Sequence, residues 1–215
     1  MATIGDNLQA IRARLGPVIL LAVSKGQSSD AVRQAAAAGQ KAFGENYVQE
    51  GVEKMDALPG LEWHLIGPLQ SNKTRLVAER FAWVQTVASE KIARRLSEQR
   101  PASLPPLNVL IQVNVSGEST KSGVAPEEVK ALSKGMKDLK GIRLRGLMAI
   151  PEPGADRSRY RSVKALYDSL KDEYGFDTLS MGMSDDMETA IAEGSTMVRI
   201  GTAIFGASKK EKSAA

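Results

Sequence analysis

Short apolar runs and longer amphipathic stretches alternate along most of this 215-residue chain. The runs are rich in Val, Ile and Leu and nearly free of charge, which predicts strands buried on both faces, as in a parallel sheet. We expect strands at residues 17–25, 41–46, 61–67, 83–87, 108–115, 143–150, 178–183 and 197–206. Helical spacing, with capping residues at the ends, predicts helices at 5–15, 31–38, 47–58, 72–81, 89–100, 126–141, 156–174 and 184–194.

Eight strands separated by helices at regular spacing favour an α/β fold of the (β/α)8 TIM barrel type. We expect one domain over residues 1–208, with the N-terminal helix included, and a frayed tail at 209–215. A doubly wound sheet is the alternative, but it needs a phosphate-binding loop after the first strand, which Ser24-Lys-Gly-Gln27 is not. No helix is expected after the eighth strand, so the N-terminal helix can fill that place in the outer ring.

The composition excludes several kinds of functional site. The chain has no cysteine and a single histidine, His64, which excludes disulfides, thiolate nucleophiles and Cys/His zinc sites. The net charge is +4, but 29 basic residues are interleaved with 25 acidic ones, so we expect no nucleic-acid partner. No apolar run is long enough to span a bilayer and the N-terminus lacks a signal sequence. We therefore expect a cytoplasmic protein with no membrane partner.

Lys25 ends the first expected strand. Apolar neighbours favour the neutral form of an amine, and a neutral lysine amine is a nucleophile toward carbonyl groups. Schiff-base chemistry is one interpretation of this position. The other is that a strand must end in some polar residue, and Lys25 is only that residue.

Barrels of this kind carry their functional sites at the carboxyl ends of the strands, and they commonly bind phosphate with the loops after strands seven and eight. A ligand with a phosphate at one end and an aldehyde at the other would connect that region to Lys25, and pyridoxal 5′-phosphate (PLP) has this shape. The polar or small residues at the expected strand ends are Lys25, Asn46, His64, Asn114, Ser180, Ser184, Arg199, Gly201 and Thr202.

These residues differ in what they indicate. Arg199 can face the ring nitrogen of PLP, although an arginine inside a barrel can equally pair with a carboxylate. Ser180 and Thr202 can contact a phosphate, or they can be ordinary strand residues. Asn46 and His64 can line the ligand or serve as hydrogen-bonded structural residues. No metal site and no catalytic residue is expected.

Five segments, in order along the chain, resemble one known family. They are Ala22–Lys25, Phe43–Tyr47, Trp63–Gly67, Leu179–Asp186 and Val198–Gly206. Together they are similar to the YggS/PROSC family of PLP-binding homeostasis proteins, and the resemblance covers nearly the whole chain.

The resemblance implies a single-domain barrel like the N-terminal domain of alanine racemase. It implies PLP held as a Schiff base on Lys25, its phosphate near Ser180, Gly201 and Thr202, and Arg199 facing the pyridine nitrogen. It also implies a role in intracellular PLP homeostasis, as a carrier or regulator that passes cofactor to apo PLP-dependent enzymes without turning over a substrate. We expect such a protein to act as a monomer.

Two positions at which family members carry a lysine limit what the resemblance implies. Many bacterial relatives carry a second lysine two residues after the Schiff-base lysine, and this chain has Gln27 there. Any role of that second lysine in cofactor transfer therefore cannot be assigned to this chain. Lys121 resembles another family lysine near the barrel mouth, but a solvated loop lysine is the more economical interpretation.

A PLP-dependent racemase is the alternative function. A two-base racemase needs an acid or base on each face of the cofactor, and in alanine racemase one of them is supplied by a second domain of the partner subunit. The expected single domain offers no such group. An arginine opposite the pyridine nitrogen would also keep that nitrogen unprotonated and weaken the ring as an electron sink, which favours the carrier.

Overall fold

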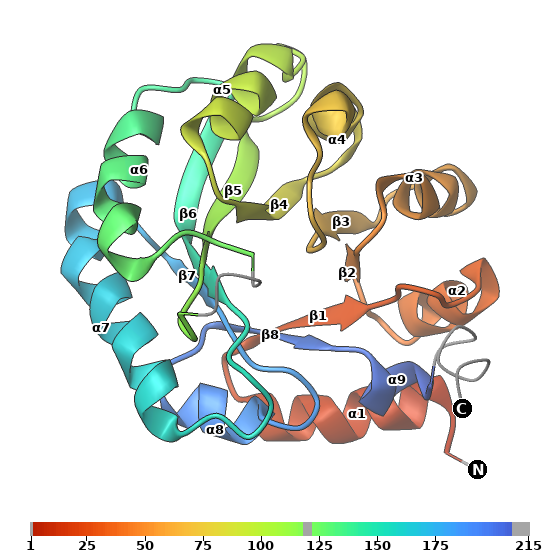
Figure 1. Ribbon diagram of the computed structural model, residues 1–215. Coiled ribbons are helices and arrows are strands. Elements are labelled where there is room, and N and C mark those ends of the chain that lie inside the picture. Colours follow the sequence, from red (N-terminus) through yellow and green to blue (C-terminus); the bar gives the residue numbers. More distant parts are fainter. Residues whose placement is uncertain (1, 118–121, 208–215) are drawn as a thin grey trace.

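The computed structural model describes residues 2–117 and 122–207, and it contains a closed barrel of eight parallel strands surrounded by helices (Figure 1). The strands pair in sequence order, and β8 closes on β1. They are β1 (Ile19–Val23), β2 (Ala42–Glu45), β3 (Glu62–Leu65), β4 (Trp83–Val87), β5 (Leu107–Val113), β6 (Ile142–Ala149), β7 (Thr178–Ser180) and β8 (Met197–Ile200). The predicted TIM barrel is thus confirmed.

The helices lie outside the barrel and cover the outward faces of the strands (Figure 1). They are α1 (Ile4–Leu15), α2 (Ser29–Ala37), α3 (Val48–Ala57), α4 (Thr74–Arg80), α5 (Glu90–Gln99), α6 (Val129–Met136), α7 (Arg157–Tyr174), α8 (Met187–Ala192) and α9 (Thr202–Phe205), with 3-10 turns η1 (Ser71–Lys73) and η2 (Pro126–Glu128). Every expected helix has a counterpart. In the described part of the chain, no helix combines the length and apolar character needed to cross a membrane.

Helix α1 fills the gap in the outer ring, as the sequence led us to expect. Thr3 and Asp6 form a capping box at its start, and its apolar face buries Leu8 and Ile11. The Asn7 side chain donates a hydrogen bond of 2.9 Å to the Ile204 carbonyl of α9. In Figure 1, α1 runs outside β1 and β8, between α8 and α2.

The prediction for the end of the eighth strand was wrong. We expected a strand to Gly206, but β8 ends at Ile200 and α9 follows. The N–H groups of Ile204 and Phe205 both donate to the Gly201 carbonyl, and Ile204 is fully buried. An apolar segment this short has no periodicity that separates strand from helix. The seventh strand is also shorter than expected: it ends at Ser180, and Gly182 adopts a φ of +100°.

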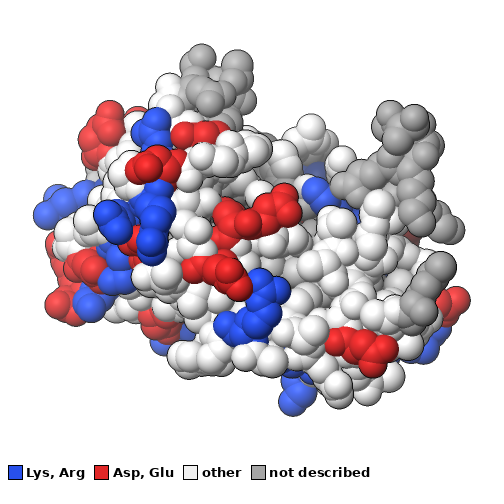
Figure 2. Space-filling view, turned by 90° about the horizontal axis from the view of Figure 1, so that it is seen from below, with Lys and Arg blue, Asp and Glu red and all other residues white. Residues whose placement is uncertain are grey.

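Figure 2 shows the molecule from the side of α1 and α8, with acidic and basic side chains intermingled on this face. Arg14 of α1 pairs with Glu188 of α8 at 2.7 Å. Glu193 pairs with both Arg157 and Arg161 of α7, at 2.7 and 2.9 Å. Interleaved charges in the sequence therefore become ion pairs between neighbouring helices here. The tail at 209–215 and Lys121 lie outside the described residues.

Candidate functional site at the barrel mouth

A cavity of about 250 Å³ opens at the carboxyl ends of the strands. Successive residues of a strand face opposite sides of the sheet, so alternate residues near the strand ends reach this cavity from inside the barrel. Of the nine residues expected at the strand ends, seven were given a possible contact with PLP. Five of these seven line the cavity, and they come from the ends of β1, β2 and β8: Lys25, Asn46, Arg199, Gly201 and Thr202. The remaining lining residues are Val23, Ile66, Ile150, Met183, Ser184 and Asp185.

Lys25 lies at the open end of this cavity, two residues beyond the end of β1. Its side chain is exposed, which differs from the apolar surroundings that the sequence led us to expect. The reason is that β1 stops at Val23, so Lys25 already belongs to the turn above the barrel. Gln27, the residue at the place of the second family lysine, donates from Nε2 to the Gly206 carbonyl at 3.5 Å. The turn after β1 and the end of α9 therefore meet at one side of the mouth.

Beneath this turn lies a buried ion cluster, the Lys54 cluster, made of Glu45, Glu50 and Lys54. Lys54 Nζ donates to Glu45 Oε1 at 2.7 Å, to Glu50 Oε1 at 2.8 Å and to the Ser24 carbonyl at 2.6 Å. Burial raises the pKa of Glu45, and the charge and hydrogen bond of Lys54 oppose that rise. Glu45 Oε2 is buried with no hydrogen-bond partner among the described residues.

The Lys54 cluster holds the chain on both sides of Lys25. On one side, Lys54 binds the Ser24 carbonyl, and Ser24 Oγ donates to Glu45 Oε1 at 2.5 Å. On the other side, the Gly26 N–H donates to Glu50 Oε1 at 2.6 Å. Lys25 thus belongs to a turn that is anchored to β2 and α3.

Arg199 forms the floor of the cavity and is almost completely buried. Its Nη1 donates to Ser180 Oγ at 2.7 Å and its Nη2 to the Ala149 carbonyl at 2.9 Å. Burial lowers the pKa of Arg199 to about 10, with the charge of Asp186 opposing that change. The guanidinium therefore stays charged near neutral pH, held by neutral groups rather than by the carboxylate partner that one interpretation of the sequence allowed.

Next to the end of β1, with which β8 pairs, Gly201 and Thr202 line the cavity where α9 begins. The first N–H groups of any helix are left free by the helix itself, and Thr202 and Ala203 are both exposed. A Cβ atom on Gly201 would lie 3.2 Å from the Val23 carbonyl oxygen, so the chain passes close to β1 there. The hydroxyl of Thr202 and these N–H groups give this side hydrogen-bond donors suited to an anion.

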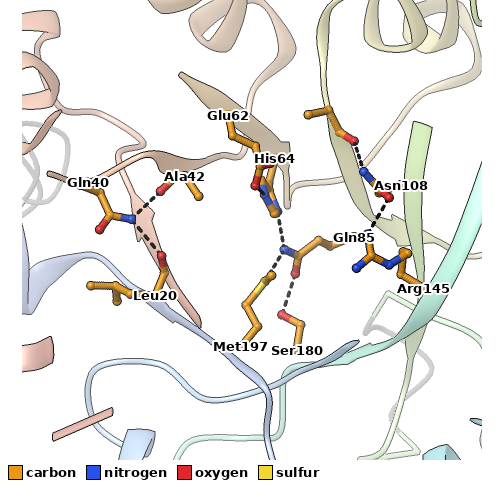
Figure 3. Close-up of polar contacts among 11 residues, drawn as sticks. Leu20, Gln40, Ala42, Glu62, His64, Gln85, Asn108, Arg145, Ser180 and Met197 are labelled. Carbon is orange, nitrogen blue, oxygen red and sulfur yellow. Dashed lines mark hydrogen bonds and ion pairs between the residues drawn. The ribbon is translucent and has the colours of Figure 1, made fainter. Parts of the chain in front are cut away.

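Two predicted site residues, His64 and Ser180, do not line the cavity. Both side chains are fully buried inside the barrel, one layer below the mouth. Ser180 Oγ donates to Gln85 Oε1 at 2.6 Å, and Gln85 Nε2 donates to His64 Nδ1 at 2.9 Å (Figure 3). Ser180 therefore contacts Arg199 rather than the anion-binding side that the sequence suggested.

Sequence reasoning missed Glu45, Glu50, Lys54 and Gln85. Glu50 and Lys54 are spaced as neighbours on a helix surface, a pattern typical of solvated pairs, and nothing in the sequence shows that they fold under the turn of Lys25. Gln85 did offer a signal, because a long polar side chain in a strand that is buried on both faces needs a hydrogen-bond partner inside the fold.

Comparison with known proteins places the chain among relatives that share its fold and length. Residues 1–209 match the family described as alanine racemase, N-terminal domain. The pyridoxal phosphate homeostasis protein of Pseudomonas aeruginosa is 56% identical, over 96% of each chain. The protein of the same name from Escherichia coli K12 is 53% identical, over 96% of this chain and 94% of the relative.

Solved structures agree with this placement. PipY of Synechococcus elongatus with PLP bound superposes with a TM-score of 0.87 at 36% identity, covering 95% of this chain and 100% of PipY. Alanine racemase of Corynebacterium glutamicum superposes with a TM-score of 0.79 at 19% identity, covering 96% of this chain and 61% of the racemase. At 19% identity, the likeness to alanine racemase shows a shared fold alone.

Proposed function

The chain belongs to the alanine racemase N-terminal domain family and, within it, to the pyridoxal phosphate homeostasis proteins, and from this premise we propose that it binds PLP at the barrel mouth and serves in PLP homeostasis. The observation that carries the proposal is the convergence of Lys25, Arg199 and Thr202 on one cavity. Lys25 lies near one end of the sequence and Arg199 and Thr202 near the other, and each supplies a group that PLP requires.

The donor set of the cavity fits PLP in both chemistry and size. The cavity offers a primary amine from Lys25, a buried guanidinium from Arg199, and the hydroxyl of Thr202 together with the first N–H groups of α9. A volume of about 250 Å³ lies near the lower limit of about 300 Å³ for small-molecule pockets, as expected for a compact cofactor. Asn46 and Ser184 add polar groups to the lining.

Lys25 is the residue that we propose attaches PLP. Bound PLP supplies an aldehyde that forms a reversible imine with a primary amine. The Lys54 cluster fixes the backbone on both sides of Lys25, and this limits the positions that its amine can take. The exposure of Lys25 leaves the same amine accessible from solvent, which suits a protein that must also release its cofactor.

Arg199 is the residue that we propose faces the ring nitrogen. Because its pKa stays near 10, it donates a hydrogen bond at neutral pH and accepts none. A ring nitrogen that accepts this bond stays unprotonated, so the electron-withdrawing power that most PLP enzymes use is reduced. This supports a carrier or regulator over a racemase, and we propose that the protein turns over no amino acid.

We propose that apo PLP-dependent enzymes receive the cofactor, and that the protein acts as a cytoplasmic monomer. The donors around Thr202 hold the phosphate in this proposal, and Ser180 acts through Arg199. Retention then depends on a few contacts at an open mouth together with one reversible bond, which allows the cofactor to be passed on.

Arg199→Ala and Thr202→Val should each weaken PLP binding without unfolding the protein. Each substitution removes a charge-assisted hydrogen bond to the cofactor, worth roughly ten- to a hundredfold in affinity. Fluorescence titration measures the dissociation constant. Thr178→Val, the same change at the far end of the barrel, is the matched control and should leave affinity unchanged. Unchanged affinity in both cavity variants would place the PLP site elsewhere.

The carrier role predicts transfer without turnover. Holo-protein mixed with an apo PLP-dependent enzyme should restore the activity of that enzyme, because the imine at Lys25 exchanges reversibly. Incubation of the holo-protein with single L- or D-amino acids should give no racemised, deaminated or decarboxylated product. Turnover near the usual enzyme rate of about 10 s⁻¹ would instead favour the racemase alternative.

A further inference from the structure

A continuous chain of hydrogen-bonded side chains runs through the barrel interior below the cavity, and Figure 3 shows most of it. Arg199 Nη1 donates to Ser180 Oγ at 2.7 Å, and Ser180 Oγ donates to Gln85 Oε1 at 2.6 Å. Gln85 Nε2 donates to His64 Nδ1 at 2.9 Å, and His64 Nε2 donates to Glu62 Oε1 at 2.9 Å. The chain connects the floor of the cavity with the amino ends of the strands.

This polar chain occupies the layer that branched apolar side chains fill in most barrels of this type. The four residues other than Glu62 are at most 3% exposed, while the Glu62 side chain is 49% exposed. Buried polar groups cost free energy unless every one is hydrogen-bonded, so the links of such a chain depend on one another. The residues come from β8, β7, β4 and β3, which means that the chain crosses the barrel rather than following one strand.

All the hydrogen bonds of the chain point in the same direction. Each group donates toward Glu62, from the positive guanidinium at one end to the carboxylate at the other. His64 takes part only as the neutral tautomer with its proton on Nε2, because Nδ1 must accept from Gln85. If Nδ1 carried a proton, the Gln85 amide would have to turn over and present its NH2 group to Ser180. Ser180 Oγ would then accept from both Gln85 and Arg199, and its own O–H would lose the acceptor that Gln85 Oε1 provides, which would weaken the bond from Arg199.

The surroundings of His64 keep the ring neutral. Burial lowers its pKa below the ordinary value of 6.5, and this outweighs the hydrogen bond and charge of Glu62, which act in the opposite direction. The ring stacks on Trp83, with 4.9 Å between centroids, and the Arg145 guanidinium of β6 lies 4.7 Å from the Trp83 ring centroid. The charged groups nearest to His64 are therefore Glu62, which it contacts, and Arg145, on the Trp83 ring. Arg199 is separated from His64 by the Gln85 and Ser180 side chains.

We propose that Ser180, Gln85 and neutral His64 are positioning residues that hold Arg199 in place and thereby set how tightly the protein retains PLP. The inference rests on the proposed function, since it assigns Arg199 a contact with PLP. None of the three residues touches the cavity, so each acts through Arg199 alone. A purely structural polar chain would instead stabilise the barrel and leave cofactor affinity unchanged.

A double-mutant cycle on the dissociation constant for PLP separates these roles. His64→Leu removes the acceptor for Gln85 and should weaken binding roughly three- to tenfold, the effect of one lost hydrogen bond. His64→Asn keeps an acceptor near the place of Nδ1 and should restore most of the affinity. In a Ser180→Ala background, where the chain is already broken, His64→Leu should have almost no further effect.

Gln40→Leu is the matched control. Gln40 is also a buried amide at the barrel, and its Nε2 donates to the carbonyls of Leu20 and Ala42 at 2.8 Å each, apart from the chain (Figure 3). Its replacement should lower the melting temperature and leave PLP affinity unchanged. If His64→Leu does not fold, Gln85→Met breaks the same link and enters the same cycle.

The pH dependence gives a second readout. Protonation of His64 breaks the chain, so wild-type affinity should fall once the pH drops below the lowered pKa of His64. PLP itself titrates, so the comparison is with His64→Asn, which should lack this additional loss. The apo protein should lose stability as the pH falls below 6.5, because the unfolded chain takes up the proton first.

Two outcomes overturn the inference. Full additivity of His64→Leu and Ser180→Ala would show that His64 does not act through Ser180. Identical affinity in wild type and all chain variants, with PLP bound normally, would leave the chain a structural element only. Failure of the wild type to bind PLP at all would refute the proposed function itself, so the two failures are distinguishable.

Discussion

Replacing Lys25 with alanine is expected to abolish covalent attachment of PLP while leaving the barrel folded. The side chain is exposed, so its removal creates no cavity in the core. Arg199 and the donors around Thr202 remain, and the variant should still bind PLP weakly without the absorption band of the imine. Absorption spectroscopy of the purified protein after incubation with PLP measures this directly.

The control for this variant is Lys41→Ala, which removes another exposed lysine, directly before β2 and away from the cavity. It should keep the wild-type spectrum. An unchanged imine band in Lys25→Ala, or loss of the band in both variants, would show that attachment does not depend on Lys25.

Lys54→Met should cause the largest loss of stability among the substitutions considered. It leaves the carboxyl groups of Glu45 and Glu50 beneath the turn without their ammonium partner. Removal of one partner from a buried ion pair costs about 3–5 kcal/mol, a large part of a total stability of about 5–15 kcal/mol. The turn around Lys25 should loosen as well, so PLP affinity should fall in the fraction that remains folded. Urea denaturation gives the free energy of unfolding.

Lys130→Met is the matched control, because Lys130 pairs with Glu173 at 3.7 Å on the surface. An exposed pair of this kind is worth about 0–1 kcal/mol, so the control should unfold near the wild-type midpoint. Equal destabilisation in the two variants would mean that the Lys54 cluster contributes no more than a surface ion pair.

The barrel was predictable because its strands are buried on both faces. Uncharged runs such as Trp83–Val87 carry that signal, and the observed strand has the predicted bounds. The end of β8 was not predictable in the same way. Residues 203–205 are apolar in either conformation, and the choice of α9 depends on bonds to the Gly201 carbonyl that no sequence pattern marks.

The part of the site that follows from the barrel topology alone was predictable. Residues at the carboxyl ends of parallel strands meet at one face, and this was enough to bring Lys25, Asn46 and Arg199 together. His64 and Ser180 were placed at the same face because strand bounds inferred from sequence are uncertain by about two to four residues. In the structure the chain continues beyond β3 and β7, so residues such as Ile66 and Met183 form the rim in their place.

The Lys54 cluster lay beyond sequence reasoning for a different reason. Charged residues on an amphipathic helix normally face solvent, and only the docking of α3 against the turn after β1 brings Lys54 under Lys25. The residues that anchor a functional side chain are thus harder to predict than that side chain. They depend on tertiary contacts between segments whose sequences show no pattern that indicates the contact.

The position of the attached cofactor on the chain is the decisive measurement for PLP binding at the barrel mouth. Holo-protein reduced with borohydride converts the reversible imine into a stable amine, and peptide mass mapping then identifies the modified lysine. If Lys25 holds the cofactor, the digest contains a single pyridoxyl adduct, on Lys25. An adduct on a different lysine, or the absence of any adduct on protein saturated with PLP, would contradict this assignment.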